Sequence, residues 1–172
     1  MKKKIRLITI VALTFLMNGC GLYNFSGAST GTAESFQVNF FQNFAGQSPG
    51  STIEPGLDRD FTNALQDLIS SLTSLNLTSN NGDLLYEGEI IEYRVAPITA
   101  TANQIAAQNR LTISVNVRFF NNTKEDSDFE RRFSFFFDFP GTSLLENVKN
   151  EAQEEIFERI TQDIFNRSLA DW

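Results

Sequence analysis

Strict alternation of apolar and polar residues in two neighbouring segments is the feature that most limits the fold of this chain. In residues 111–119 the odd-numbered positions are Leu, Ile, Val, Val and Phe, and the even-numbered positions are Thr, Ser, Asn and Arg. Residues 129–139 place five Phe and one Arg on the odd-numbered side, opposite a mainly polar side. A period of two residues predicts β-strands with one buried face. The short polar segment 121–128 between them predicts an antiparallel pair.

Another strand is expected near the beginning of the chain. Residues 35–41 alternate, with Phe36, Val38 and Phe40 on the predicted buried face. By the same parity, Phe41 is expected on the opposite face. The following segment is rich in Gly, Pro and polar residues and is expected to be a loop.

Residues 84–95 predict a further strand, in which the apolar phase changes along the chain. Tyr86 and Ile90 share one parity, whereas Tyr93 has the other. A β-bulge adds one residue to one strand and shifts the phase in this way. Because glycine is frequent at bulges, we expect the bulge near Gly88.

Two segments show the spacing of amphipathic helices. From Leu57 to Leu75, apolar residues recur at intervals of three and four, which predicts a helix with one buried face. Ser143 and Glu146 have the spacing of a capping box, in which a hydroxyl and a carboxylate each accept from a backbone N–H. They predict the start of a second helix, which continues to about Leu169.

The order of these elements, β-α-β-β-β-α, predicts an α+β fold in a single domain over residues 35–172. A helix between the first two strands makes them parallel if they share a sheet, and the polar turns make the later pairs antiparallel. One apolar face per strand and one apolar stripe per helix predict two layers. The expected architecture is two helices packed on one side of a four-stranded mixed sheet, with loops at 42–56 and 97–109.

The N-terminus has the pattern of a secretory signal over residues 1–19. Three Lys and one Arg within residues 2–6 lead into an apolar run that is too short to span a membrane. The single Cys of the chain, Cys20, follows a small residue directly after this run. This placement resembles a bacterial lipobox, which implies that Cys20 is lipidated and that residues 20–34 form a flexible tether. The alternative is an ordinary secreted protein with an unpaired cysteine.

The composition points away from an enzyme and from nucleic acid as a partner. The chain contains no His, which excludes Ser-His-Asp and Cys-His nucleophile activation and most zinc sites. Lys and Arg number 14 against 21 Asp and Glu, and the net charge of −7 opposes general binding to a phosphate backbone. We therefore expect no catalytic residue, no metal and no cofactor.

Two sequence patterns that could indicate catalysis have simpler interpretations. Gly27–Gly31 matches the form of a hydrolase nucleophile elbow, but it lacks the strand, the helix and the His that this motif requires. Acid pairs such as Asp58 with Asp60 and Glu154 with Glu155 lie on predicted helix surfaces. We interpret them as solvated charges rather than as paired catalytic acids.

Aromatic residues on the even-numbered side of the strands suggest a surface for a partner. Phe120 and Phe136 fall on the outward face by parity, as does Phe41, and Arg118 and Arg132 lie on the same face. Exposed aromatic residues supply contact area and Arg supplies bidentate pairing with phosphate or carboxylate. The alternatives are that a loop or the second helix covers these residues, or that a bulge reverses the parity.

The mature N-terminus, Cys20-Gly-Leu-Tyr-Asn-Phe-Ser-Gly27, resembles that of the LptE family of lipopolysaccharide-assembly lipoproteins. The strand ending at residues 38–43, the Leu-x-Tyr-x-Gly-x-Ile strand at 84–90, the strand beginning at 110–113 and the terminal helix follow the order of that family. The extra Leu22 and the high content of Phe depart from it.

The resemblance implies an outer-membrane lipoprotein, anchored at Cys20 and facing the periplasm. Its expected partners are lipopolysaccharide and an LptD-type β-barrel, whose lumen it would occupy and whose folding it would assist. Its expected function is insertion of lipopolysaccharide into the outer leaflet. The alternative function is that of an accessory lipoprotein in an ABC-type lipid transport system. A secreted hydrolase is a third possibility, which the absence of His disfavours.

Overall fold

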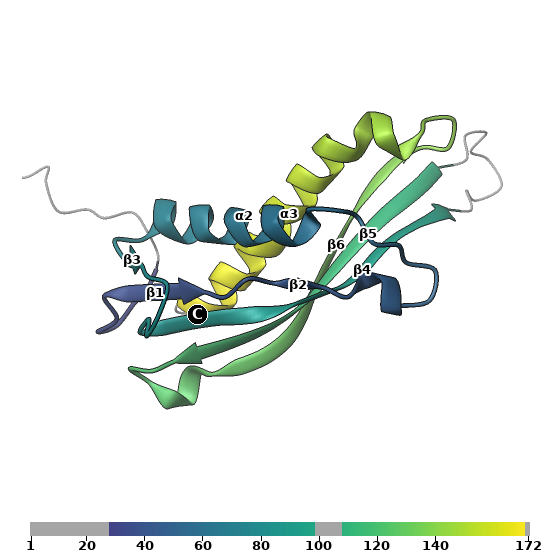
Figure 1. The fold of residues 1–172 in the computed structure, drawn as a ribbon. Coiled ribbons are helices and arrows are strands. Elements are labelled where there is room, and N and C mark those ends of the chain that lie inside the picture. The colour runs from purple at the N-terminus through teal and green to yellow at the C-terminus, as the bar shows by residue number, and fades with distance from the viewer. Residues whose placement is uncertain (1–27, 99–107, 171–172) are drawn as a thin grey trace, which may run out of the picture.

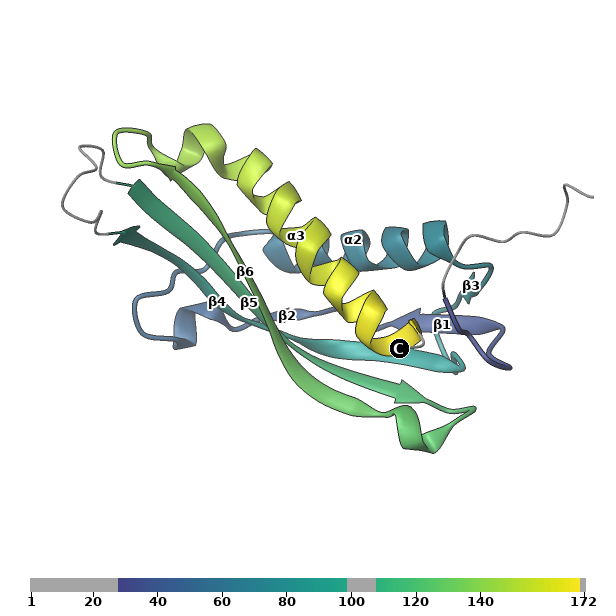
Figure 2. The same cartoon turned by 180° about the vertical axis from the view of Figure 1, so that it is seen from behind.

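The computed structural model describes residues 28–98 and 108–170, and the predicted signal and Cys20 lie outside these residues. Two long helices lie on one face of a twisted mixed sheet (Figures 1 and 2). The α+β class and the two-layer arrangement are therefore confirmed. The sheet contains six strands rather than four, in the order β3-β1-β4-β5-β6 with β2 also paired to β4.

Three long antiparallel strands form most of the sheet. They are β4 (Leu84–Ile98), β5 (Gln108–Asn121) and β6 (Phe129–Pro140). In the middle of this sheet Val115 of β5 lies opposite Ile90 of β4 and Phe133 of β6. The five apolar side chains at odd-numbered positions of residues 111–119 are all fully buried. The predicted parity of β5 is thus confirmed, because every second residue faces the helices.

The first predicted strand, residues 35–41, is divided into β1 (Ser35–Val38) and β2 (Gln42–Asn43), both parallel to β4. A further two-residue strand, β3 (Asn76–Leu77), pairs with β1 at the edge of the sheet. These elements account for the two additional strands. A two-residue strand has no room for a detectable alternation of apolar and polar residues, so the sequence pattern misses it.

The division between β1 and β2 reverses the predicted parity of Phe40 and Phe41. The Phe41 ring is fully buried, whereas the Phe40 side chain is 59% exposed. The Phe41 N–H donates to the Thr62 hydroxyl oxygen at 3.1 Å instead of to a neighbouring strand. The strand is interrupted between Val38 and Gln42, and within this interruption the Phe41 ring turns inward and packs edge to face on Phe61 at 5.1 Å. The expectation that Phe41 faces outward is wrong.

The bulge in β4 lies at Ile91 and not near Gly88. The register of β4 against β5 shifts between Ile90 and Glu92, and Gly88 pairs regularly with Val117. Residue 88 is a glycine because two neighbouring groups approach its Cα closely. A Cβ atom on residue 88 would lie 2.0 Å from the Asn116 carbonyl oxygen and 2.8 Å from the Phe41 ring.

The helix α2 (Leu57–Leu72) begins after Gly56, which has a φ of 81° and caps it without a side-chain hydrogen bond. The first of its buried residues is Leu57, followed by Phe61, Leu65 and Ile69 at intervals of four, and all four are at most 1% exposed. These positions confirm the predicted apolar stripe. The helix is shorter than predicted. It ends at Leu72, so Leu75, the last residue of the predicted stripe, lies beyond it.

The helix α3 (Leu145–Leu169) has the predicted extent, but it starts without the predicted capping box. Its N-cap is Leu144, and no side chain accepts a hydrogen bond there. The Ser143 N–H donates to the Pro140 carbonyl oxygen at 2.9 Å, so Ser143 belongs to the turn that follows β6. The side chain of Ser143 is therefore one residue too early to cap the helix.

The described N-terminal residues lie against the domain. Ala28 forms an isolated β-bridge with Ala170 at the end of α3. The Asp83 carboxylate accepts hydrogen bonds from the Glu34 N–H at 2.9 Å and from the Ser35 N–H and hydroxyl at 3.0 and 2.9 Å. These bonds fix the beginning of β1 beside β4. Residues 28–34, the last part of the expected tether, thus contact the folded domain.

Candidate partner-binding surfaces

The even-numbered face of β5 and β6 points away from the helices. The helix α3 packs on the opposite face of the sheet (Figure 2). Phe133 and Phe139 of β6 are buried on that face. Phe136 is 41% exposed on the outward face, and Phe120 is half-buried there. The helix α3 therefore does not cover these two predicted surface residues.

The two aromatic residues lie far apart on this face. Phe120 is opposite Leu85 of β4, whereas Phe136 is opposite Thr112 of β5. Positions 112 and 120 are separated by eight residues along one strand. At about 3.3 Å per residue this corresponds to roughly 26 Å. Phe120 and Phe136 thus form two separate contact points and not one aromatic patch.

Both predicted arginines are already ion-paired within the sheet. The Arg118 guanidinium donates to Glu87 and to Glu89, with N–O distances of 3.1 Å to each. Arg132 pairs with Glu92 and donates to the Ser114 hydroxyl oxygen at 2.9 Å. Each guanidinium has five N–H donors, and the bonds within residues 28–98 and 108–170 use only part of them. Either arginine therefore has donors left for the phosphate or carboxylate of a partner.

Glu92 pairs with two arginines, Arg94 and Arg132. Partial burial acts to raise the pKa of Glu92, but the hydrogen bond from Ser114 and the charges of Arg94 and Arg132 outweigh it. The pKa of Glu92 is therefore lowered below its ordinary value. Ser114 itself is completely buried, and its hydroxyl lies 2.8 Å from the Glu92 carboxylate. The outward face is thus a polar surface whose opposite charges largely satisfy one another.

Two further aromatic residues are exposed beside Arg118: Phe40, which was expected on the buried face, and Phe44, which no sequence pattern singled out. Phe40 and Phe44 are 59% and 41% exposed and, with Arg118 and Glu87, they line a shallow cavity of about 290 Å³. The sequence did contain a sign that one aromatic residue is exposed here. Residues 40 and 41 are both Phe, and only one of two successive strand residues can face the core.

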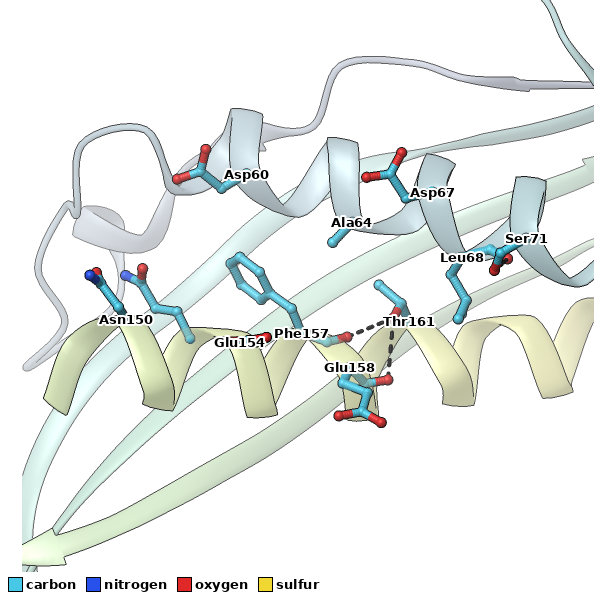
Figure 3. Close-up of a pocket in the computed structure, with 11 residues that line it drawn as sticks. Asp60, Ala64, Asp67, Leu68, Ser71, Asn150, Glu154, Phe157, Glu158 and Thr161 are labelled. Carbon is cyan, nitrogen blue, oxygen red and sulfur yellow. Dashed lines mark hydrogen bonds between the residues drawn. The ribbon is translucent and has the colours of Figure 1, made fainter.

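A second surface lies on the other side of the molecule, between the two helices. Figure 3 shows Ala64 and Leu68 of α2 facing Phe157 and Thr161 of α3 across an open groove of about 590 Å³. The Thr161 hydroxyl donates to the carbonyl oxygens of its own helix, at 2.7 Å to Phe157 and 3.2 Å to Glu158. The floor of the groove is therefore apolar.

Carboxylates stand on both rims of this groove. Asp60 and Asp67 lie on α2, and Glu154 and Glu158 lie on α3 (Figure 3). Glu154 was expected to be a solvated charge, and it is exposed. The sequence could not indicate that these four acids line one groove, because residues 73–144 separate the two helices in the chain.

Within residues 28–98 and 108–170, no group of three or more His, Cys, Asp or Glu side chains is placed to hold a metal ion. No helix in the same residues is both long enough and apolar enough to cross a membrane.

Comparison with known proteins identifies the family. A model of the LptE family, described as lipopolysaccharide-assembly, matches residues 33–168. This range runs from just before β1 to the last turn of α3. The chain belongs to the LptE family. The LptE family consists of lipopolysaccharide-assembly lipoproteins associated with the bacterial outer membrane and with lipopolysaccharide transport.

Solved structures similar to this LptE-family chain include other bacterial proteins at low identity. A minor lipoprotein from Acinetobacter baumannii is 10% identical with a TM-score of 0.49, over 78% of this chain and 91% of that one. The hypothetical protein CT253 from Chlamydia trachomatis is 12% identical with a TM-score of 0.47, over 81% and 100% of the two chains. PelC from Paraburkholderia phytofirmans, solved as a dodecamer, is 11% identical with a TM-score of 0.41, over 79% and 94%. No curated protein sequence matches the chain.

Proposed function

We propose that this protein partners an LptD-type β-barrel and assists the insertion of lipopolysaccharide into the outer leaflet. It would do so as a lipoprotein, anchored in the outer membrane through Cys20 and facing the periplasm. The observation that carries the proposal is the family match, which covers the sheet and both helices. Residues 1–19 would be the signal peptide, residues 20–34 the lipidated tether and residues 35–172 the working domain.

The outward face of the sheet is the surface that we propose for the barrel. The lumen of an outer-membrane barrel is polar, and a polar face whose charges are paired internally can enter it without unpaired buried charges. Phe40, Phe44, Phe120 and Phe136 would supply the apolar contacts on this face. Arg118 and Arg132 would keep these internal pairs and bind acceptors on the barrel or on lipopolysaccharide through their remaining N–H donors.

A role as an assembly protein and not as an enzyme agrees with the chemistry of the chain. The sequence has no His, and cleavage after residue 19 removes four positive charges, taking the net charge from −7 to −11. A strongly acidic protein attracts the phosphates of lipopolysaccharide poorly at long range. Contact with lipopolysaccharide would therefore depend on local pairing at the outward face.

The proposal is tested by purifying the full-length protein from membranes under mild detergent and identifying what accompanies it. An outer-membrane β-barrel that co-purifies in a fixed ratio supports the proposal. An inner-membrane ABC complex in its place would contradict it and would support the alternative of an accessory lipoprotein for lipid transport. Depletion of the protein should also reduce lipopolysaccharide at the cell surface.

A further inference from the structure

The groove between α2 and α3 is a second binding surface, separate from the sheet face of the proposed function. Its floor is formed by apolar parts of Ala64, Leu68, Phe157 and Thr161 (Figure 3). Beneath it, the rings of Phe61 and Phe157 pack edge to face at 5.4 Å and close the base of the groove. Phe157 is 7% exposed and Thr161 is 2% exposed, so the base is closely packed, whereas Ala64 and Leu68 are partly exposed.

The small side chain of Ala64 creates much of this space. Its neighbours at intervals of four along α2, Asp60 and Leu68, are both larger, so the surface of α2 is indented between them. The groove follows α2 from Asp60 to Ser71, eleven steps along the helix, which corresponds to about 16 Å at 1.5 Å per residue. Three turns of a helix have the same length.

The charge around the groove has one sign. Four of its lining residues are acidic, namely Asp60, Asp67, Glu154 and Glu158, and none of the lining residues in the described chain is basic. Asp60 pairs with Arg59 at 2.9 Å on the exposed surface of α2. In residues 28–98 and 108–170, no Lys or Arg nitrogen lies within salt-bridge distance of the other three carboxylates.

We propose that this groove binds a cationic amphipathic helix of a partner protein. The apolar floor would take the apolar stripe of that helix, and Lys or Arg side chains flanking the stripe would pair with the two acidic rims. Glu154 and Glu158 are one turn apart, and Asp60 and Asp67 are two turns apart, so cations at helical spacing on the ligand match both rims.

Charge also decides against the other occupants. The phosphates of lipopolysaccharide and of anionic lipids would meet four carboxylates, and such like-charge contacts are unfavourable. A second copy of this chain would present another acidic helix layer, because the exposed carboxylates of α2 and α3 outnumber their basic residues. The partner is therefore a basic segment of a different protein.

The experiment uses the full-length lipoprotein in nanodiscs of zwitterionic phosphatidylcholine, with empty nanodiscs as the background. The probe is a fluorescent Leu/Lys peptide of about 14 residues with Leu at helical spacing, and its binding is followed by fluorescence anisotropy. The variant Asp67→Lys with Glu158→Lys reverses one charge on each rim. We expect it to weaken binding by at least about tenfold, since two attractive pairs become repulsive.

A matched control makes the same change of charge outside the groove. Glu151 and Glu155 are exposed on α3 and do not line the groove. Glu151→Lys with Glu155→Lys should therefore weaken binding by less than about twofold, the effect of net charge alone. Equal losses in the two double variants, or no loss in either, would overturn the proposal.

Two further measurements test the shape and the fold of the groove. Ala64→Trp should fill the floor and reduce peptide binding although it changes no charge. A Leu/Glu peptide should bind the Asp67→Lys, Glu158→Lys variant more tightly than it binds the unaltered protein, and this gain requires a folded groove.

Two controls test whether the apolar floor takes part in binding. A shuffled Leu/Lys peptide should bind more weakly than the amphipathic peptide, and spermine should compete with the amphipathic peptide less effectively than an unlabelled copy of that peptide does. Equality in either comparison would show that the apolar floor is not used and would also overturn the proposal.

Discussion

The guanidinium carbon of Arg110 lies 3.5 Å from the centre of the Phe136 ring. The same guanidinium donates to both carboxylate oxygens of Asp138, at 2.7 and 2.8 Å. The Phe136 ring also stacks on that of Phe135 at 5.5 Å. Arg110 of β5 thus contacts two side chains of the neighbouring strand β6, and Phe136 is 41% exposed on the outward face.

This arrangement leads to a prediction for the proposed contact with the barrel. Phe120→Ser with Phe136→Ser should weaken co-purification of the barrel by about tenfold or more, because buried aromatic residues dominate binding energy at interfaces. The domain should remain folded, since an exposed cation–π contact contributes only about 0.5–1 kcal/mol. Leu77→Ser is the control, because Leu77 is 49% exposed at the far edge strand β3. Unchanged barrel binding by a folded double variant would place the interface elsewhere.

A second prediction concerns the two faces of β5. Val115→Asp puts a charge on a fully buried position, which should lower the free energy of unfolding by about 3 kcal/mol or more. Thr112→Asp adds the same charge on the outward face, where Arg94 lies opposite residue 112, and should change it by less than about 1 kcal/mol. Urea denaturation of both variants measures the difference. Asn116 is a poorer control, since its amide donates to Glu89 and Glu130.

A third prediction concerns the close packing around Gly88. Gly88→Ala should destabilise the domain by about 3 kcal/mol or more, because the added methyl group meets the Asn116 carbonyl oxygen and the Phe41 ring. Gly31→Ala is the comparison. At Gly31 there is open space and only the positive φ of 56° opposes a side chain, so the cost should be about 1 kcal/mol. Similar losses of stability in the two variants would contradict the close approach at Gly88.

Asp83 predicts how stability depends on pH. The hydrogen bonds from the Glu34 N–H and the Ser35 hydroxyl hold the pKa of Asp83 below its ordinary value of 3.8. A carboxylate with a lowered pKa in the folded state stabilises the fold above its unfolded pKa, and this contribution is lost as the pH falls through the folded pKa. Asp83→Asn should therefore lower the melting temperature at pH 7, and its difference from the unaltered protein should shrink below pH 4.

The control for Asp83 is Asp163→Asn, a substitution at an exposed position of α3. It should leave both the melting temperature at pH 7 and its pH profile unchanged. A difference between Asp83→Asn and the unaltered protein that stays constant from pH 7 to pH 3 would mean that the carboxylate charge is not what stabilises the start of β1.

The lipid anchor is tested at Cys20. Cys20→Ser should give either an unprocessed precursor or a soluble periplasmic form, because the thiol is the site of acylation in the proposal. Membrane fractionation and intact-mass measurement distinguish these forms from the acylated protein. Unaltered protein that is soluble and carries no acyl mass on Cys20 would contradict the proposed lipoprotein.

The sequence by itself determined the buried faces of β5, β6 and α2. Alternation in residues 111–119 and 129–139 places β5 and β6 correctly, and the apolar stripe from Leu57 locates α2. These features are local, because the periods of two and 3.6 residues state which side of an element avoids water. The resemblance to the LptE family is also a property of the sequence, and the family match confirms it.

Only the tertiary structure decided the features that depend on residues far apart in the chain. Phe41 is buried because its N–H reaches Thr62 on α2, and the bulge lies at Ile91 because of pairing with β5. The charges of Arg118 and Arg132 are satisfied by carboxylates of β4, and the acidic groove exists only where α2 meets α3. The period of a sequence pattern indicates whether a side chain is buried, but it does not indicate which distant group contacts that side chain. The contacts that shape both proposed binding surfaces are of this second kind.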